Sequence, residues 1–379
     1  MRIMSIVAAL PLLALAACGG AGPETAGGIA PPTGASGNVS GGTGAGVTAG
    51  PSGTTPAAAT SFLSVGAETS FTAIGGMHSL TYKSDTNGTS EFYQGNASTP
   101  TTPSGTISYS PRDGIFTIAF SDTKAGVTNN TRFQDPAHRD DLTGQQLAAL
   151  QVPSLVGFNY LVASSPTDTT TFFYQRPNAT LYVSLAGFAH TATDGTGALT
   201  ERDRGVFAFG TPTVQAQIPI SGAGTYKGGF LATAVLDTGN VQPSVMQWIA
   251  GDSAVKVDFG ASTVALSLNG TVGDGFRNGT VLPSSSLAFP AGTAFTATGT
   301  ATIDLLRTGG FSGAFGNAAL GGSAIDFSGI KPGNNVAGAS SIDGAFFGPN
   351  AVNVGGSFRI VGGVPNQRVD IQGAFTGSR

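Results

Sequence analysis

The sequence predicts an all-β protein: an N-terminal β domain followed by a soluble, eight-stranded antiparallel β-barrel. Three observations carry this prediction. Glycine accounts for 58 of the 379 residues, and charged residues make up only 10%. Short runs of alternating apolar and polar residues recur at intervals of about 8–12 residues, separated by Gly, Asn, Asp or Pro, as in sandwiches and barrels. The apolar period of an amphipathic helix is nearly absent.

The first residues are typical of a lipoprotein export signal. A short positive segment precedes the apolar run 6–17, which is too short to cross a bilayer as a permanent helix. Leu15-Ala-Ala-Cys18 places small residues before a cysteine, as a lipobox does. The pattern predicts residues 1–17 as a signal peptide and Cys18 as the lipidated first residue of the mature chain, acylated with groups such as palmitate.

Cys18 is the only cysteine, so the exported chain has no internal disulfide and must be stabilised by a hydrophobic core. Gly19 follows it, where an aspartate would indicate retention at the inner membrane in many Gram-negative bacteria. We therefore expect a lipid-anchored outer-membrane protein exposed at the cell surface. Residues 18–60, rich in Gly, Ala, Pro, Ser and Thr, predict a flexible tether spanning roughly 35 Å.

Residues 61–215 predict the first β domain. The segment 143–150 is its one expected helical turn, and it follows the charged loop 135–141. Variable loops on a rigid scaffold often carry recognition, so 135–141 and 166–170 are the candidate ligand-selecting loops. The expected strands are 79–83, 90–93, 105–110, 115–120, 171–175 and 181–188.

Residues 216–379 predict the barrel. A hairpin is expected from 255–259 and 264–268, joined by Gly260-Ala-Ser-Thr263. Near the C-terminus a strand over 341–347 is interrupted by Gly348-Pro349-Asn350, because proline lacks a donor and glycine and asparagine tolerate positive φ. A partner strand follows over 354–360. Further strands are expected at 295–303, 310–315, 323–327 and 369–375, and closure would remove exposed edges.

We expect this barrel to lie outside the membrane, filled by side chains including those of Phe259, Phe295, Phe347 and Phe358. A membrane barrel needs apolar outward faces over about 9–11 residues per strand and aromatic girdles. Several expected strands are shorter, and Trp248 is the only tryptophan. A lipid anchor would also be redundant on a barrel that spans the membrane.

The sequence contains no catalytic, cofactor or metal motif, so no enzyme, cofactor or metal centre is predicted. His78, His138 and His190 lie far apart, without the ligand spacing of a zinc site, and no nucleophile elbow occurs. The glycine-rich stretches 41–46 and 273–279 predict flexible segments rather than phosphate loops. Removing Arg2 with the signal leaves 16 of the 17 basic side chains against 21 acidic ones, which disfavours a nucleic-acid partner.

Three features leave alternatives open. The loop 135–141, which contains His138, is either solvated or holds a cation or a partner. The segment Glu201-Arg-Asp-Arg204 predicts a solvated mixed-charge loop, with docking of the two domains or of a partner as the alternative. The third feature is a group of tyrosines in the first domain, which are either ordinary strand residues or haem ligands, because a phenolate can ligate haem iron. They are Tyr82, Tyr93, Tyr160, Tyr174 and Tyr182.

Three motifs of the chain resemble those of one known family. Ala345-Phe-Phe-Gly-Pro-Asn-Ala351 followed by Val354-Gly-Gly-Ser-Phe358, with Asn353 where an acidic residue is expected, resembles the closing signature of the lipoprotein barrel in the transferrin-binding protein B family of bacterial surface lipoproteins. Ser221-Gly-Ala-Gly-Thr-Tyr-Lys-Gly-Gly-Phe230 resembles the opening strand. Arg204-Gly-Val-Phe-Ala-Phe-Gly-Thr-Pro212 resembles the junction between the family's handle-like domain and barrel. The resemblance implies a single lobe of one handle-like domain and one barrel.

The resemblance also implies a function. Such proteins bind a cargo, which is a metal-carrier protein, haem or a small solute, and deliver it to an outer-membrane transporter of the TonB-dependent type. Relatives reach the surface through a surface lipoprotein translocon. The alternative is a structural or adhesive surface lipoprotein without a transported cargo. The sequence assigns no ligand-binding residues.

Overall fold

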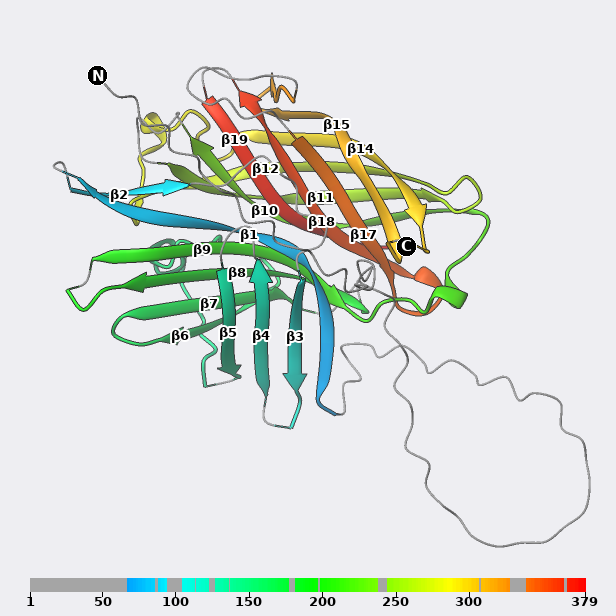
Figure 1. Cartoon of the computed structure of the whole chain (residues 1–379), viewed down its shortest axis with the longest axis horizontal. Helices are drawn as coiled ribbons and strands as arrows, with labels where there is room; N and C mark the ends of the chain where they lie inside the picture. Colours follow the sequence, from blue (N-terminus) through cyan, green and yellow to red (C-terminus); the bar gives the residue numbers. More distant parts are fainter. Residues whose placement is uncertain are drawn as a thin grey trace, which may run out of the picture. The chain divides into compact units, whose positions relative to one another are not determined.

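The chain folds into two antiparallel β-sheets, which belong to one compact unit, Gly53–Arg379 (Figure 1). The computed structural model describes residues 67–85, 88–93, 104–112, 114–122, 127–135, 137–176, 181–196, 198–237, 244–306, 308–327, 339–364 and 367–379. The predicted signal peptide, Cys18 and the predicted tether lie outside the described residues. The all-β prediction is confirmed.

The first sheet has the order β5-β4-β3-β1-β9-β8-β7-β6, and β2 pairs with β1. In the long strands at its centre, successive side chains point to opposite faces of the sheet. Its strands are β1 (Thr69–Asp85), β2 (Gly88–Tyr93), β3 (Ser104–Ser110), β4 (Ile115–Asp122), β5 (Val127–Gln134), β6 (Phe158–Ser164), β7 (Asp168–Gln175), β8 (Val183–Thr193) and β9 (Leu199–Gly210).

The first sheet is nearly closed by the segment after β5. Arg139 forms an isolated antiparallel bridge with Leu161 of β6. The amide of Asp140 donates to the carbonyl of Tyr160 at 3.2 Å, and the amide of Val162 donates to the carbonyl of His138 at 2.8 Å. These bonds use backbone groups that an open edge would expose. The segment predicted as a charged loop at 135–141 therefore pairs with β6 over part of its length and nearly closes the first sheet.

The predicted helical turn is confirmed as α1 (Gly144–Ala149). Its start is fixed by a capping box: the Thr143 hydroxyl accepts from the amide of Gln146, and the Gln146 side chain accepts from the amide of Thr143. Leu147 is its buried residue and packs with side chains of both sheets. The helix therefore serves to anchor the loop that follows it.

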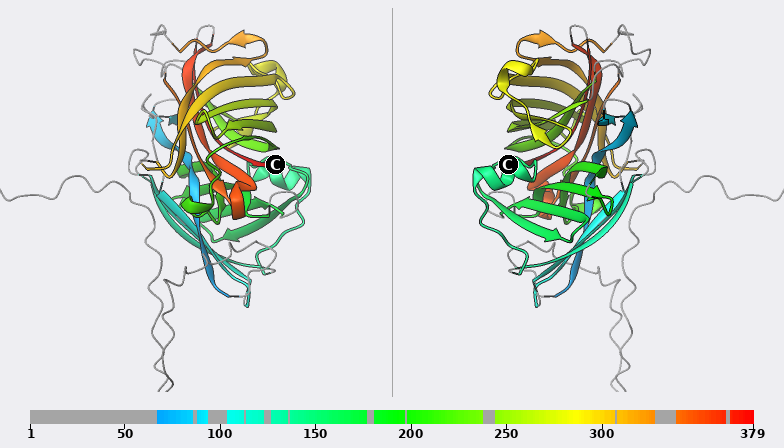
Figure 2. Two further views of the ribbon diagram at one scale, coloured as in Figure 1. Left: turned by 90° about the vertical axis from the view of Figure 1, so that its right-hand side faces the viewer. Right: turned by 90° about the vertical axis from the view of Figure 1, so that its left-hand side faces the viewer.

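The second sheet is a closed barrel. Its order is β11-β10-β19-β18-β17-β15-β14-β12, β11 also pairs with β12, and the short β13 and β16 pair with β12 and β15. Figure 2 shows this ring from two sides. The predicted eight-stranded antiparallel barrel is confirmed. Its strands are β10 (Ala223–Asp237), β11 (Val245–Asp258), β12 (Thr263–Arg277), β13 (Thr280–Val281), β14 (Ala294–Asp304), β15 (Gly310–Leu320), β16 (Ser323–Ala324), β17 (Ala339–Phe347), β18 (Asn353–Val364) and β19 (Gln367–Ser378).

The two predicted reversals in the barrel are confirmed. β11 and β12 pair from Asp258↔Thr263 onward, which forms the expected hairpin. β17 and β18 pair across the short 3-10 helix η4 (Pro349–Ala351). Gly348 and Asn350 have φ of 71° and 53°, a conformation that glycine and asparagine adopt more readily than other residues.

The remaining 3-10 helices of the described residues are η2 (Gln215–Gln217) and η3 (Ser284–Ser286). The predicted domain boundary at 215–216 coincides with η2, and the division into domains stays a prediction.

The barrel interior is a single apolar cluster that contains Phe259, Phe295 and Phe358, as predicted. Phe347 corrects the prediction, because it belongs to a second cluster shared by the two sheets. β18 is buried at every position from Asn353 to Val364, so both of its faces are covered. Its inward face contributes to the barrel core, and the opposite face is covered by the first sheet.

The contact between the sheets combines this apolar cluster with buried charges. His78 of β1 faces Thr233 of β10 and Asp370 of β19, and Asp370 also binds Arg359 of β18. At Gly76 a Cβ atom would lie 1.2 Å from the terminal amide of Gln372, so glycine lets this side chain of β19 lie directly against β1. No helix among the described residues is long and apolar enough to span a membrane.

Candidate functional site

The neighbouring strands β7, β8 and β9 carry polar side chains on both of their faces. Thr170 pairs with His190, and His190 pairs with Asp203, so these residues lie side by side across the three strands. This face continues into the interior of the first sheet, where Phe172, Phe188 and Phe207 form its apolar core. The opposite face, which includes Thr171 and Ala189, is directed toward the barrel.

On the inner face, His190 lies between two carboxylates. Its Nδ1 is 2.9 Å from Oδ2 of Asp203, and its Nε2 is 2.7 Å from Oδ2 of Asp168. Asp203 is 1% exposed, whereas the side chain of Asp168 is 49% exposed, so the cluster runs from the buried interior to the surface. Glu201, two residues before Asp203 on the same face of β9, is partly exposed.

The electrostatics of this cluster follow from its geometry. The hydrogen bond to Asp203 is the main cause that raises the pKa of His190 to about 9, against the opposing effect of burial. Burial, followed by the charge of Asp203, raises the pKa of Glu201 above its ordinary value. The imidazole ring is therefore held as a cation among carboxylates that compete for positive charge.

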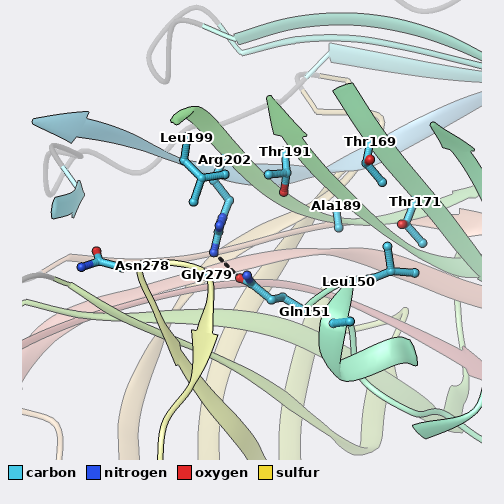
Figure 3. A pocket seen from close by; sticks show the side chains of 11 residues that line it. Leu150, Gln151, Thr169, Thr171, Ala189, Thr191, Leu199, Arg202, Asn278 and Gly279 are labelled. Atoms are coloured by element: carbon cyan, nitrogen blue, oxygen red, sulfur yellow. Dashed lines mark hydrogen bonds between the residues drawn. The ribbon is translucent and has the colours of Figure 1, made fainter. Parts of the chain in front are cut away.

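On the opposite face, the same strands line a hollow of about 350 Å³ (Figure 3). The first sheet contributes threonine hydroxyls and the Arg202 side chain to one wall of the hollow. The segment after α1 forms a second wall. The turn between β12 and β13 of the barrel forms the remaining wall. Its lining is Ala149, Leu150, Gln151, Thr169, Thr171, Ala189, Thr191, Leu199, Arg202, Asn278 and Gly279. The hollow therefore combines polar groups from both sheets.

Gln151 fixes the shape of this hollow. It has a positive φ of 56° and is 4% exposed. Its side-chain oxygen accepts hydrogen bonds from the guanidinium groups of Arg202 and Arg204. Its backbone carbonyl accepts from Nε1 of Trp248 at 2.8 Å. One residue of the segment after α1 is thus bonded to both β9 and the barrel strand β11.

The structure changes two predictions about charged and glycine-rich segments. The segment 201–204 is a strand within β9, not a solvated loop, and Arg202, Asp203 and Arg204 are each at most 1% exposed. Strand alternation places its acids and its arginines on opposite faces: Asp203 contacts His190 on one face, and Arg202 and Arg204 contact Gln151 on the other. The stretch 273–279 is not a flexible segment: Gly273 to Arg277 belong to β12, and Asn278-Gly279 is a turn with φ of 48° and 81°.

The three histidines occupy separate places. His138 accepts a hydrogen bond from the amide of Gln134 at the end of β5, and His78 lies in the contact between the sheets.

Sequence reasoning missed the carboxylate neighbours of His190, because they lie 13 and 22 residues away in the chain. The one available signal was that Asp168, His190 and Asp203 occupy inward positions of three consecutive strands. The candidate loop 166–170 is mostly strand, since β7 begins at Asp168.

His78 belongs to a set of groups that resembles a catalytic relay. Its Nδ1 is 2.8 Å from the hydroxyl of Thr233, and its Nε2 is 3.2 Å from Asp370. The exposed fractions are 0% for His78 and Thr233 and 1% for Asp370. A nucleophile must meet its substrate, and nothing can reach this hydroxyl from solvent. The arrangement therefore stabilises the contact between the sheets.

Two of the tyrosines considered as haem ligands have structural roles. The Tyr160 hydroxyl donates to the carbonyl of Pro153 at 2.7 Å and accepts from the amide of Leu155 at 2.9 Å. The Tyr174 hydroxyl accepts from Asn159 at 3.1 Å, and burial raises its pKa. A phenol that is engaged in this way positions loops and strands.

No family model matches the chain, and no curated protein matches it. Solved structures of transferrin-binding protein B are similar to it in fold. Intact Ap-TbpB, with its N and C lobes, is 12% identical, with 82% of this chain and 77% of that chain covered and a TM-score of 0.34. The Tyr-167-Ala and Trp-176-Ala double mutant from Haemophilus parasuis Hp5 is 14% identical, with 83% and 76% covered and a TM-score of 0.33.

A third similar structure is the isotype 1 protein from serogroup B Neisseria meningitidis. It is 11% identical, with 83% of this chain and 77% of that chain covered and a TM-score of 0.31.

Proposed function

We propose that this protein is a non-enzymatic surface lipoprotein, anchored in the outer membrane through Cys18, that binds a cargo and delivers it to an outer-membrane transporter. The lipobox at 15–18, the composition of 18–60 and the resemblance of the barrel motifs support this proposal. The tether would hold the folded part clear of the lipid headgroups. A surface lipoprotein translocon and a TonB-dependent-type transporter would be its partners.

The observation that carries the binding function is the hollow between β7–β9, the segment after α1 and the β12–β13 turn. Its volume of about 350 Å³ lies at the lower end of the range for small-molecule sites. Hydroxyls of Thr169, Thr171 and Thr191 offer both donors and acceptors along one side. Among the three classes of cargo, these features favour a small polar solute.

The hollow is held in shape before any ligand arrives. Gln151 is bonded to Arg202, Arg204 and Trp248, so the segment after α1 cannot move without breaking buried hydrogen bonds. A site that is already ordered loses less conformational entropy on binding. The ordered segment would therefore favour tight binding of a solute that fits the hollow.

A tryptophan placed in the hollow tests cargo binding. The Thr191→Trp substitution puts a large ring among the lining side chains, and we expect it to reduce cargo uptake at least tenfold. The measurement is native mass spectrometry of the full chain after incubation with spent medium from iron-starved cells. A wild-type chain with a reproducible added mass identifies the cargo, and the size of that mass separates a solute, haem and a carrier protein.

The matched control is Thr298→Trp, because Thr298 is exposed on the outer face of β14, away from the lining residues. It should retain the added mass. Equal retention by Thr191→Trp would contradict the assignment of the hollow as the cargo site. An unmodified wild-type mass in every medium would favour the structural or adhesive alternative.

The lipid anchor is tested by Cys18→Ser. A serine hydroxyl is not a substrate for thiol-directed acylation, so we expect the variant to lose incorporation of labelled palmitate and to leave the membrane fraction. Gly19→Ala keeps the cysteine and serves as the control. A Cys18→Ser chain that stays labelled and membrane-bound would contradict the proposed anchor.

A further inference from the structure

We propose that His190, Glu201 and Asp203 form a binding site for a first-row divalent cation at the solvent end of β8 and β9. One nitrogen of the imidazole and one oxygen of each carboxylate lie within 4.8 Å of one another. This site lies on the inner face of the first sheet, whereas the hollow lies on the opposite face. The inference does not depend on the identity of the cargo.

The spacing of the three donors suits a metal ion. Typical bond lengths of about 2.0–2.2 Å from zinc to nitrogen and carboxylate oxygen place donor atoms about 3.4 Å apart in a tetrahedral site. Nδ1 of His190 and Oδ2 of Asp203 are 2.9 Å apart. These two atoms would have to separate by about half an ångström, which side-chain rotation on adjacent strands can supply.

Asp203 provides an independent observation. Its side chain is 1% exposed, and its second oxygen, Oδ1, has no hydrogen-bond donor among the described residues. A buried carboxylate oxygen normally has a donor, because the oxygen loses its water on folding and an unreplaced hydrogen bond is unfavourable. One oxygen of Glu201 lies within 4.8 Å of an oxygen of this carboxylate, so a single cation can contact both groups.

Asp168 completes the arrangement as an outer partner. Its Oδ2 lies 2.7 Å from Nε2 of His190 and accepts the proton there, which leaves Nδ1 directed at Asp203. Histidine ligands of metals usually donate their other N–H group to a carboxylate or carbonyl, which fixes the tautomer and the ring orientation. The ring of His190 is therefore already oriented to present Nδ1 as a ligand.

Charge and access favour the same conclusion. Three carboxylates surround one imidazole, and the arginines next to them in β9 project to the opposite face of the sheet. Glu201 is partly exposed and the Asp168 side chain is 49% exposed, so an ion can enter from solvent. Binding would displace the proton from Nδ1 and leave open coordination positions for water. Imidazole and carboxylate donors suit Zn²⁺ and its first-row neighbours.

The test is a calorimetric titration of the full chain with Zn²⁺, in a Cys18→Ser background that removes the single thiol as a competing ligand. We expect one Zn²⁺ per chain. The Glu201→Gln variant should bind Zn²⁺ at least tenfold more weakly, because a neutral amide replaces a charged ligand. Asp168→Asn should weaken binding by about 10- to 100-fold, as expected for an outer partner of a ligating histidine.

The control is His138→Gln, which removes a histidine that accepts from Gln134 at the end of β5 and should leave the affinity unchanged. Circular dichroism melting without metal verifies that each variant folds, and Glu201→Gln is suitable because Glu201 is only partly buried. Absence of Zn²⁺ uptake by the wild-type chain would overturn the proposal. The proposal would also be overturned if a folded Glu201→Gln variant still bound Zn²⁺ and the His138→Gln variant did not.

Discussion

The Asp370→Ala substitution is expected to lower the free energy of unfolding by about 3–5 kcal/mol, the range for removing one member of a buried ion pair. Asp370 is 1% exposed and accepts from Nη2 of Arg359 at 2.7 Å and from Nε of Arg359 at 3.1 Å. It also lies 3.2 Å from Nε2 of His78 on the other sheet. Alanine would leave the buried guanidinium of Arg359 without its carboxylate, and urea unfolding followed by circular dichroism measures the loss.

Asp252→Ala is the matched control, since Asp252 is exposed on the barrel strand β11 and its loss should change the free energy of unfolding by less than about 0.5 kcal/mol. Asp370→Asn keeps the shape and removes the charge, so it separates charge from packing. If Asp370→Ala and Asp252→Ala unfold at the same urea concentration, the ion cluster does not stabilise the contact between the sheets.

The same carboxylate predicts how stability depends on pH. Burial by itself would raise the pKa of Asp370, but the charge of Arg359 and the hydrogen bond from His78 outweigh it and lower the pKa well below its ordinary value of 3.8. A lowered pKa in the folded state stabilises the fold above pH 3.8. That contribution is lost as the pH falls below this value, and Asp370→Asn should flatten this part of the acid-unfolding curve.

The Trp248→Ala substitution is expected to cost about 3–5 kcal/mol of unfolding free energy, the range for truncating a large buried aromatic residue. Trp248 is 2% exposed and packs edge-to-face on Phe173 with ring centroids 5.5 Å apart. Its Nε1 donates to the carbonyl of Gln151. Alanine would open a cavity between the sheets and leave that carbonyl without its donor. Urea unfolding followed by circular dichroism is the measurement, because the variant has no tryptophan fluorescence.

Trp248→Phe separates the two contributions. It retains most of the ring packing and loses the hydrogen bond, so we expect about 1–2 kcal/mol. Leu306→Ala is the control, because Leu306 is 91% exposed and its truncation should be nearly neutral. A Trp248→Ala chain as stable as Leu306→Ala would show that the cluster shared by the two sheets does not contribute to stability.

Local patterns were sufficient to predict much of the fold. The hairpin between β11 and β12 and the reversal between β17 and β18 each depend on a few turn residues next to alternating strands. The helical turn α1 likewise depends on Thr143 and Gln146, three residues apart. These signals lie within the segment that they define, so a sequence is enough to find them. Expected strands were often too short: β1 runs over Thr69–Asp85, whereas 79–83 was predicted.

The candidate sites were not predictable in the same way. Glu201-Arg-Asp-Arg204 has the composition of a solvated loop, and it is a largely buried strand because Gln151 and His190 supply partners from elsewhere in the chain. Phe347 resembles any other inward barrel residue in the sequence. Only the position of the first sheet against β17–β19 makes its face of the barrel a buried one.

The sequence by itself determined the all-β class and the two reversals in the barrel, because alternation and turn chemistry act over a few residues. The number of expected strands then favoured an eight-stranded barrel, whose closure depends on the distant pairing of β10 with β19. The tertiary structure decided which charges are buried, which faces of the strands meet, and where the hollow and the His190 cluster lie. Those features arise from residues tens to hundreds of positions apart. Their proximity depends on strand order and register, which no local pattern encodes.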